Sequence, residues 1–428
     1  MACAARRLLN RGALPLGCAL AALWAGPAAA SDLRLFEPDN FELSGDVRAV
    51  AVDGESGWLD DGLGKLRTGS DGDLRLLPEL GNASLVWQPQ FTWSLSATVV
   101  GSVQGGETTR AGISQAYLVF RPLRSSSGTA FSARAGLMWP PVSLEHEDAD
   151  WHVASSITPS AINSWIGEEV RPAAVEGTIA ASPRNHRLRA TLALFAANDT
   201  SATLLTFRGW ALHDRTTLAF NGWRLPPLEG DIASIQGPVT HPLIDLRRGF
   251  AHRPGYYAKL AWQPPAPVRI ELFHYDNRAN PKDVNDDLEW GWRTRFEDVG
   301  VAADLGGGTQ LKVQALTGRT RMGYAMLGRH WVDNRFRSAF LLLSRPFGPI
   351  GLAVRAEGFG TRNRGSIVDA DYDESGWSAM VAAKRDWSHF TGLVELLRVS
   401  SRREDREDLG LAPRQRQTQL QAELRMHW

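Results

Sequence analysis

Cysteine is nearly absent from this chain of 428 residues, and where it does occur it is confined to the N-terminus. Cys3 and Cys18 both lie in the first 30 residues. The rest of the chain therefore has no disulfide, no thiol nucleophile and no thiolate metal site. This excludes the small disulfide scaffolds and the cysteine-based enzymes.

Long apolar runs and a net charge are also missing. After residue 30 no stretch reaches the roughly 18 apolar residues that a membrane-spanning helix needs. The 47 basic residues balance the 47 acidic ones. A nucleic-acid partner is excluded on this ground, because a phosphate backbone demands a basic surface.

The first 30 residues have the pattern of an export segment. Arg6, Arg7 and Arg11 precede the apolar stretch 13–24, and the small residues 28–30 follow it. A basic start, an apolar middle and a small-residue end are typical of a cleaved signal peptide. We therefore expect residues 1–30 to be removed and residues 31–428 to form a single domain.

What the remaining sequence does have is a period of two. From residue 41 to residue 51, Phe, Leu, Gly, Val and Ala alternate with polar side chains, and residues 91–104 repeat the pattern. Shorter alternating runs cover 131–137, 188–194, 268–272, 311–315 and 350–356. Soluble strands average roughly five or six residues, whereas a strand that crosses a bilayer at a tilt needs about ten. The pattern predicts membrane-spanning strands.

The connections between these runs alternate in length. Short links, often rich in proline or glycine, fall at 88–90, 121–128, 182–186, 263–267, 306–308, 345–349 and 386–388. Long polar connections fall at 53–73, 105–111, 139–171, 198–254, 276–289, 319–334, 361–375 and 401–417. This predicts an all-β fold: a transmembrane antiparallel up-and-down β-barrel of about 16 strands, with short periplasmic turns and long extracellular loops. The interior of such a barrel is too wide for side chains to fill.

The chain ends on another alternating run, "TQLQAELRMHW", residues 418–428. A last strand that pairs with the first would close the barrel and could not fray. Aromatic residues flank the short links and the chain end, as expected for an interfacial girdle: Trp87, Phe91, Trp93, Phe120, Trp262, Phe347, Trp387, Phe390 and Trp428.

The export segment, the alternating strands and the terminal "LQAELRMHW" together resemble the Gram-negative outer-membrane porins, of the general or phosphate-selective type. The resemblance implies an outer-membrane location, a water-filled channel for small hydrophilic solutes, no enzyme activity and no cofactor. It also implies outer-membrane lipid and lipopolysaccharide as surroundings and a homotrimer as the assembly. The barrel assembly machinery would read Leu424, Met426 and Trp428, with Trp where Phe is usual.

In porins the third long loop often folds inward and narrows the pore, which makes 139–171 the candidate constriction loop. Thr158-Pro159-Ser160 predicts a short helix that runs through Ile162 and Trp165. The loop carries six acids: Glu145, Glu147, Asp148, Asp150, Glu168 and Glu169. Inside the barrel they would face wall cations across a narrow aqueous waist and create a transverse field. The alternative is a solvated outer loop.

The interior-facing positions of the strands predict a mixed lining. Its cations are Arg48, Arg134, Arg189, Lys259, Arg269, Lys312 and Arg355. Its acids are Asp46, Glu271, Glu357, Glu395 and Glu423. The slight cationic excess leans toward anions, although the acids of the third loop could reverse it.

Other functions stay open at this point. One is an outer-membrane barrel enzyme, or a loop-based adhesin or receptor, with a closed lumen; another is a secreted β-sandwich. The sequence has neither H-E-x-x-H nor G-x-S-x-G. His146 and His152 are expected to be solvated, not metal ligands. The acids Asp369, Asp371, Asp373 and Glu374 resemble a calcium loop without its glycine and are read as solvated, with a loose divalent site as the alternative. No metal is expected.

Overall fold

A computed structural model describes residues 33–60, 62–70, 75–105, 111–122, 128–146, 148–196, 200–228, 230–243, 254–366 and 372–428. The predicted signal peptide 1–30, with both cysteines, lies outside the described residues. So do three of the acids named above, which are Glu147, Asp369 and Asp371.

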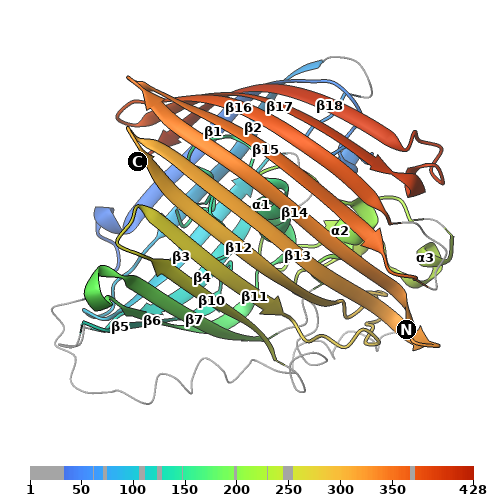
Figure 1. Ribbon diagram of the computed structural model, residues 1–428, viewed down its shortest axis with the longest axis horizontal. Helices are drawn as coiled ribbons and strands as arrows, with labels where there is room; N and C mark the ends of the chain where they lie inside the picture. The colour runs from blue at the N-terminus through green and yellow to red at the C-terminus, as the bar shows by residue number, and fades with distance from the viewer. Residues whose placement is uncertain are drawn as a thin grey trace, which may run out of the picture.

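Sixteen antiparallel strands of the described chain form one closed barrel, as predicted (Figure 1). Each strand pairs with its neighbours in sequence, and β18 closes the ring against β1. The strands are β1 (Phe41–Val52), β2 (Arg75–Trp87), β3 (Leu95–Gln104), β4 (Ala111–Phe120), β5 (Ala130–Leu137), β6 (Ala173–Ala181), β7 (Arg187–Ala196), β10 (Gly255–Gln263), β11 (Val268–Asp276), β12 (Arg293–Gly306), β13 (Thr309–Met326), β14 (Arg329–Phe347), β15 (Ile350–Asn363), β16 (Glu374–Asp386), β17 (Phe390–Arg403) and β18 (Arg414–His427).

The end of the chain is held by this closure. Trp428 and Leu43 exchange two backbone hydrogen bonds of 2.9 Å, at the point where β18 runs out alongside β1. The ring of Trp428 also packs edge-on against Phe390. The last residue is therefore part of the sheet, which confirms the prediction that the terminal run pairs with the first strand.

The outside of the barrel is apolar. Leucine and valine side chains from strands all around the ring are about half exposed, among them Leu43, Leu85, Leu192, Leu260, Val299, Leu341, Val381 and Leu420. A soluble protein rarely leaves so large a continuous apolar surface in water. The alternate residues of the same strands are buried and face inward. This is the arrangement of a transmembrane barrel, with lipid outside.

The structure differs from the predicted boundaries in two places. The run 91–104 becomes a strand only from Leu95, because Thr92 forms a turn in which its Oγ1 accepts the Leu95 N–H. The predicted long loop 319–334 is strand almost throughout: β13 and β14 extend to a tight turn at Leu327 and Gly328, both with positive φ. Arginines on the outward face of these strands conceal the alternation in the sequence.

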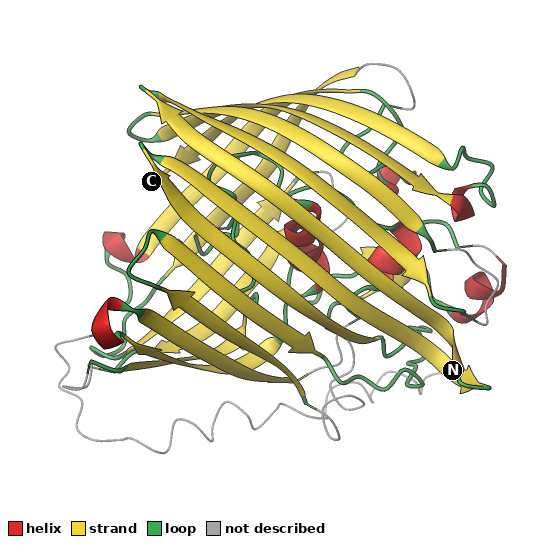
Figure 2. Cartoon of the chain, viewed as in Figure 1, coloured by secondary structure: helices red, strands yellow, loops and turns green. Residues whose placement is uncertain are grey.

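Helical segments occur between the strands (Figure 2). They are α1 (Ala161–Glu169), α2 (Thr203–Arg208) and α3 (Gly230–Ile235), with single 3-10 turns at Pro38–Asn40, Trp58–Asp60, Pro183–Asn185 and Glu404–Arg406. A two-stranded sheet joins β8 (Trp223–Arg224) and β9 (Val239–Thr240). Among the described residues, none of the helices has the length and hydrophobicity to cross a membrane.

Candidate functional site

The loop 139–171 lies inside the barrel, with α1 surrounded by strands (Figure 1). The loop exchanges hydrogen bonds with side chains on strands that are far apart around the ring: Gln115 on β4, Lys259 on β10, Gln314 on β13 and Glu395 on β17. A loop that reaches all of these walls must cross the interior. Of the two alternatives, an inward loop or a solvated outer loop, the structure selects the inward one.

The predicted helix forms where proline and serine start it. Ser160 is the N-cap of α1, and its Oγ accepts the Asn163 N–H at 3.4 Å. All nine residues of the helix are buried. Trp165 packs edge-on against Phe296 and Phe336, with ring centroids 5.3 and 5.1 Å apart. The helix is therefore packed as a core element and not as a surface loop.

Acids from the barrel wall anchor the start of α1. Glu357 accepts the backbone N–H of Ala161 at 2.8 Å, and Glu395 accepts those of Ile157 and Thr158 at 2.8 and 3.0 Å. Carboxylates are favourable at the N-terminus of a helix, where N–H groups are unpaired. Glu357 and Glu395 thus hold the loop in place, which corrects the prediction that they line an open channel.

Arg355 on β15 fastens the same loop. Its guanidinium contacts Glu145 at 3.0 Å and donates to the carbonyls of Thr158 and Pro159 at 2.8 and 3.0 Å. Burial opposes ionisation of Glu145, but Arg355 holds its pKa below the ordinary value. An opposed acid and arginine were predicted here, but they meet in direct contact instead of facing each other across water.

The second pair of loop acids faces another loop, which corrects the expectation that these acids oppose wall cations. Glu168 contacts Arg208 at 2.6 Å and His213 at 2.7 Å, all three buried. Burial tends to raise the pKa of Glu168, yet the charges of Arg208 and His213 bring it down to about 2. This cluster joins loop 139–171 to the described segment 200–243.

Glu169 ties the same two segments together through backbone donors. It accepts the N–H groups of Ala202, Leu204 and Leu205 at 3.0–3.2 Å, around the start of α2. The indole of Trp165 donates to it at 2.8 Å. Burial, reinforced by the neighbouring Glu168, raises the pKa of Glu169 to about 8.

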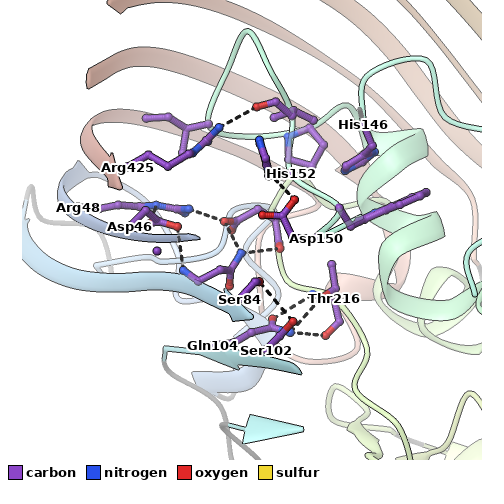
Figure 3. Close-up of a pocket in the computed structure, with 17 residues that line it drawn as sticks. Asp46, Arg48, Ser84, Ser102, Gln104, His146, Asp150, His152, Thr216 and Arg425 are labelled. Carbon is purple, nitrogen blue, oxygen red and sulfur yellow. Dashed lines mark hydrogen bonds and ion pairs between the residues drawn. The ribbon is translucent and has the colours of Figure 1, made fainter. Parts of the chain in front are cut away.

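A small polar cavity of about 40 Å³ lies between the loop and β1–β3 (Figure 3). Asp150 enters it and contacts His152 at 2.5 Å and the hydroxyl of Ser44 at 2.7 Å. Asp148, Asp150 and His152 bring one ligand atom each to within 4.8 Å of one another, a spacing that could hold a metal ion. His146, predicted to be solvated, is enclosed and stacks on Trp151; burial lowers its pKa to about 3.

Arg48 borders this cavity, and its guanidinium group is bound by three acids. Its guanidinium contacts Asp46 at 2.7 Å, Glu423 at 2.8 Å and Asp214 at 2.6 Å. Asp214 belongs to the segment 200–243, so this network also fastens a loop to the wall. Arg48 therefore acts as a bridge among three acids.

A larger cavity of about 1370 Å³ lies among β4–β7, β10 and β11, on the short-turn side of loop 139–171. We call it the vestibule. Six cationic side chains line it, namely Arg121, Arg134, Arg187, Arg189, Lys259 and Arg269, against the acids Glu176 and Glu271. Lys259 donates to the carbonyl of Pro141 at 2.6 Å, and Pro141 is part of the lining. The start of the loop therefore covers one end of the vestibule.

Half of the vestibule cations are paired. Arg134 contacts Glu176 at 2.8 Å, and both Lys259 and Arg269 contact Glu271 at 2.7 and 3.0 Å. The other three, Arg121, Arg187 and Arg189, form no ion pair with a described residue. The charge of the vestibule is thus positive.

The remaining candidates lie elsewhere. Lys312 is half-buried on β13, outside the vestibule lining. Asp373 accepts the Asn363 N–H at 2.5 Å, and Glu374 contacts Lys65 at 2.6 Å. Because Asp373 and Glu374 are turned toward protein groups, neither behaves as the solvated acid that was predicted.

Several residues of the site carry no signal in the sequence. Lys65, His213 and Asp214 lie in irregular loops and Arg208 ends the short helix α2, and none of the four belongs to a motif or a periodic run. Their roles arise because the chain folds back and places them beside residues that are distant in the sequence, as with Lys65 and Glu374 or Arg208 and Glu168. The acids Glu374 and Glu168 indicate that cationic partners are needed, but the sequence does not indicate that Lys65 and Arg208 supply them.

No family model and no curated protein matches the sequence. Solved structures share the fold. The outer membrane channel DcaP of Acinetobacter baumannii superposes with a TM-score of 0.55 at 10% identity, over 95% of this chain and 100% of that one. The anion-selective porin from Comamonas acidovorans superposes with a TM-score of 0.52 at 11% identity, over 91% and 98%. At such identity the likeness establishes the fold alone: the chain has the sixteen-strand fold of the outer-membrane porins.

Proposed function

We propose that this barrel is an outer-membrane channel through which small hydrophilic solutes diffuse passively, with a preference for anions. The observation that carries the proposal is the vestibule, a cavity of about 1370 Å³ with six cations and two acids in its lining. A polar cavity inside a membrane barrel serves no purpose in packing. An excess of one charge in such a cavity concentrates ions of the opposite sign.

The loop 139–171 is the constriction in this proposal. Pro141 covers the vestibule, and α1 is wedged between walls by Arg355, Glu357 and Glu395. A solute that leaves the vestibule must pass this loop. The loop would therefore set the size limit, and the cations ahead of it would select charge.

The proposed function as an outer-membrane channel also implies how the protein assembles. We infer a homotrimer in the outer membrane, and recognition of Leu424, Met426 and Trp428 by the barrel assembly machinery. The exposed Leu424 and Trp428 support the recognition by the assembly machinery, since they present apolar groups on the last strand. Chemical cross-linking of the folded protein in detergent, resolved by size, tests the trimer.

One observation favours the alternative of a closed lumen, as in a receptor or adhesin. The segments 53–70, 139–171 and 200–243 are interlocked in the long-loop half by buried ion pairs, such as Lys65 with Glu374 and Arg208 with Glu168. If these segments close the lumen permanently, no continuous path leads from the vestibule through the long-loop half of the barrel.

Planar bilayers separate the two functions. Folded protein is inserted into a bilayer in a gradient of KCl, and single-channel current and reversal potential are recorded. Discrete current steps with a reversal potential on the chloride side are expected. Absence of steps overturns the channel and favours the closed receptor, while steps with cation preference overturn the role given to the vestibule.

A further inference from the structure

A ladder of four arginines crosses the outside of the barrel. Arg295 on β12 lies directly opposite Arg319 on β13, Arg319 opposite Arg335 on β14, and Arg335 opposite Arg362 on β15. Because residues that are directly opposite in a sheet share a face, the four guanidinium groups stand in one row across four neighbouring strands.

The row faces outward. The residues next to these arginines in the chain point inward and are buried: Phe296, Thr320 and Phe336 are at most 1% exposed. Further down the same strands, the positions on the arginine face are the lipid-facing Val299 and Leu341. Val299, Ala339 and Leu341 belong to the apolar band that faces lipid. On β14, Arg335 of the ladder is four residues from Ala339, which is about 13 Å along a tilted strand. The ladder therefore lies beyond the long-loop edge of the apolar band, where lipid headgroups are expected.

The described residues neutralise the ladder only in part. Arg319 pairs with Asp333, but Arg295, Arg335 and Arg362 form no ion pair with any described residue. Like charges directly opposite each other in a sheet destabilise it. The surrounding surface adds seven outward arginines, of which Arg293 pairs with Asp276 and Arg402 with Glu404. Asp276 lies directly opposite Arg295, and one further acid, Glu297, is exposed on β12 beside His274. The added arginines are Arg293, Arg321, Arg337, Arg398, Arg402, Arg414 and Arg416.

The fold itself does not require this charge. Outward positions at the same end of β1–β4 are apolar, as at Ala51, Leu76, Val103 and Ile113. The arginines are confined to the β12–β18 side of the described barrel. A one-sided cluster of cations at the edge of the apolar band, most of them without an ion pair to a described residue, indicates an anionic partner on that side.

We propose that the arginine ladder is a binding site for the phosphate groups of lipopolysaccharide in the outer leaflet. The planar guanidinium group matches phosphate through two parallel hydrogen bonds, and it remains charged at any physiological pH. Basic clusters at the membrane surface bind lipid headgroups by this chemistry. The site is on the exterior, so it is independent of what passes through the interior.

Binding of lipid A to the folded barrel in detergent, followed by native mass spectrometry, tests the site. The variant Arg335→Gln/Arg362→Gln removes the centre and one end of the ladder. The matched control is Arg345→Gln/Arg385→Gln, two exposed arginines near the opposite, short-turn ends of β14 and β16, which pack on Phe347 and Trp387. The probes are bisphosphorylated lipid A, its dephosphorylated form and inorganic phosphate.

We expect the ladder variant to bind bisphosphorylated lipid A about tenfold more weakly, with wild-type affinity in the control and unchanged single-channel conductance in both. Dephosphorylated lipid A should bind the wild type as weakly as the variant binds the intact lipid. Equal binding by wild type and ladder variant overturns the proposal. So does saturation by inorganic phosphate alone at the lipid's concentration, or a change of oligomer size in the variant without loss of lipid, which would make the ladder a protein interface.

Discussion

Arg355 and Glu145 form an ion pair of 3.0 Å inside the barrel, and neither side chain is more than 1% exposed. Arg355 comes from the wall and Glu145 from the loop that crosses the interior. Near them are two further acids of the wall, Glu357 and Glu395. Among the described residues, Arg355 is the one cation that contacts the carboxylates of Glu145 and Glu357 at the start of α1.

Replacing Arg355 by glutamine should release the loop. Removal of one partner from a buried ion pair leaves an uncompensated charge and costs about 3 kcal/mol of unfolding free energy. We expect higher single-channel conductance and more frequent current fluctuations. Arg345→Gln on the exterior of the same barrel is the control. An unchanged conductance together with unchanged stability in urea would mean that the loop is held without Arg355.

The vestibule should set ion selectivity through its unpaired arginines. Arg187→Glu/Arg189→Glu reverses two charges that form no ion pair with described residues, so folding should be little affected. The reversal potential in a KCl gradient should move toward cation preference. Arg345→Glu/Arg385→Glu makes the same charge change outside the lumen and should leave it in place. A vestibule variant with wild-type selectivity would remove this cavity from the conduction path.

The acids of the loop should divide into two classes. Asp148 is 56% exposed, whereas Glu145 is 1% exposed. Asp148→Asn should shift the reversal potential slightly toward anions without changing stability. Glu145→Gln should instead lower the free energy of unfolding, because it breaks the contact with Arg355. Identical effects of the two changes would contradict the geometry.

The junction between the loops should weaken in acid. The pKa of Glu168 falls from an ordinary 4.5 to about 2 in the fold, so its stabilising contribution is complete above pH 4.5 and is lost as the pH falls toward 2. Pepsin should cut segments 139–171 and 200–243 increasingly fast over this range. Glu168→Gln should be cut faster than wild type at pH 4.5, and the two should converge near pH 2. A constant difference across the range would show that Glu168 does not titrate there.

The last strand should be indispensable, although its final side chain is replaceable. Deletion of residues 420–428 removes all but one of the pairs between β18 and β1, so an unpaired edge remains. The deleted chain should show no heat-modifiable band on a gel. Trp428→Phe should keep the band, because it preserves an interfacial aromatic. A folded band from the truncated chain would show that closure does not depend on these pairs.

The barrel is encoded in local patterns of the sequence. Alternation of apolar and polar residues fixes which face of each strand meets lipid, and the alternation of short and long connections fixes an antiparallel order with neighbours in sequence. Both are local properties, which is why the strand count and the closure of β18 on β1 could be predicted. The same rules did not predict the strands at 319–334. Outward arginines replace apolar residues there, so the two faces of the strand no longer contrast and the alternation cannot be seen.

What fills the barrel depends on contacts between distant parts of the chain. The sequence places Glu145, Glu168 and Glu169 in a loop that could fold inward or stay solvated, and their partners Arg355, Arg208 and the start of α2 are 33 or more residues away. No period relates an irregular loop to a wall, so sequence cannot tell a charge that faces water from one that is paired. Ion pairing depends on distances of a few ångströms, and these exist only once the chain has closed on itself.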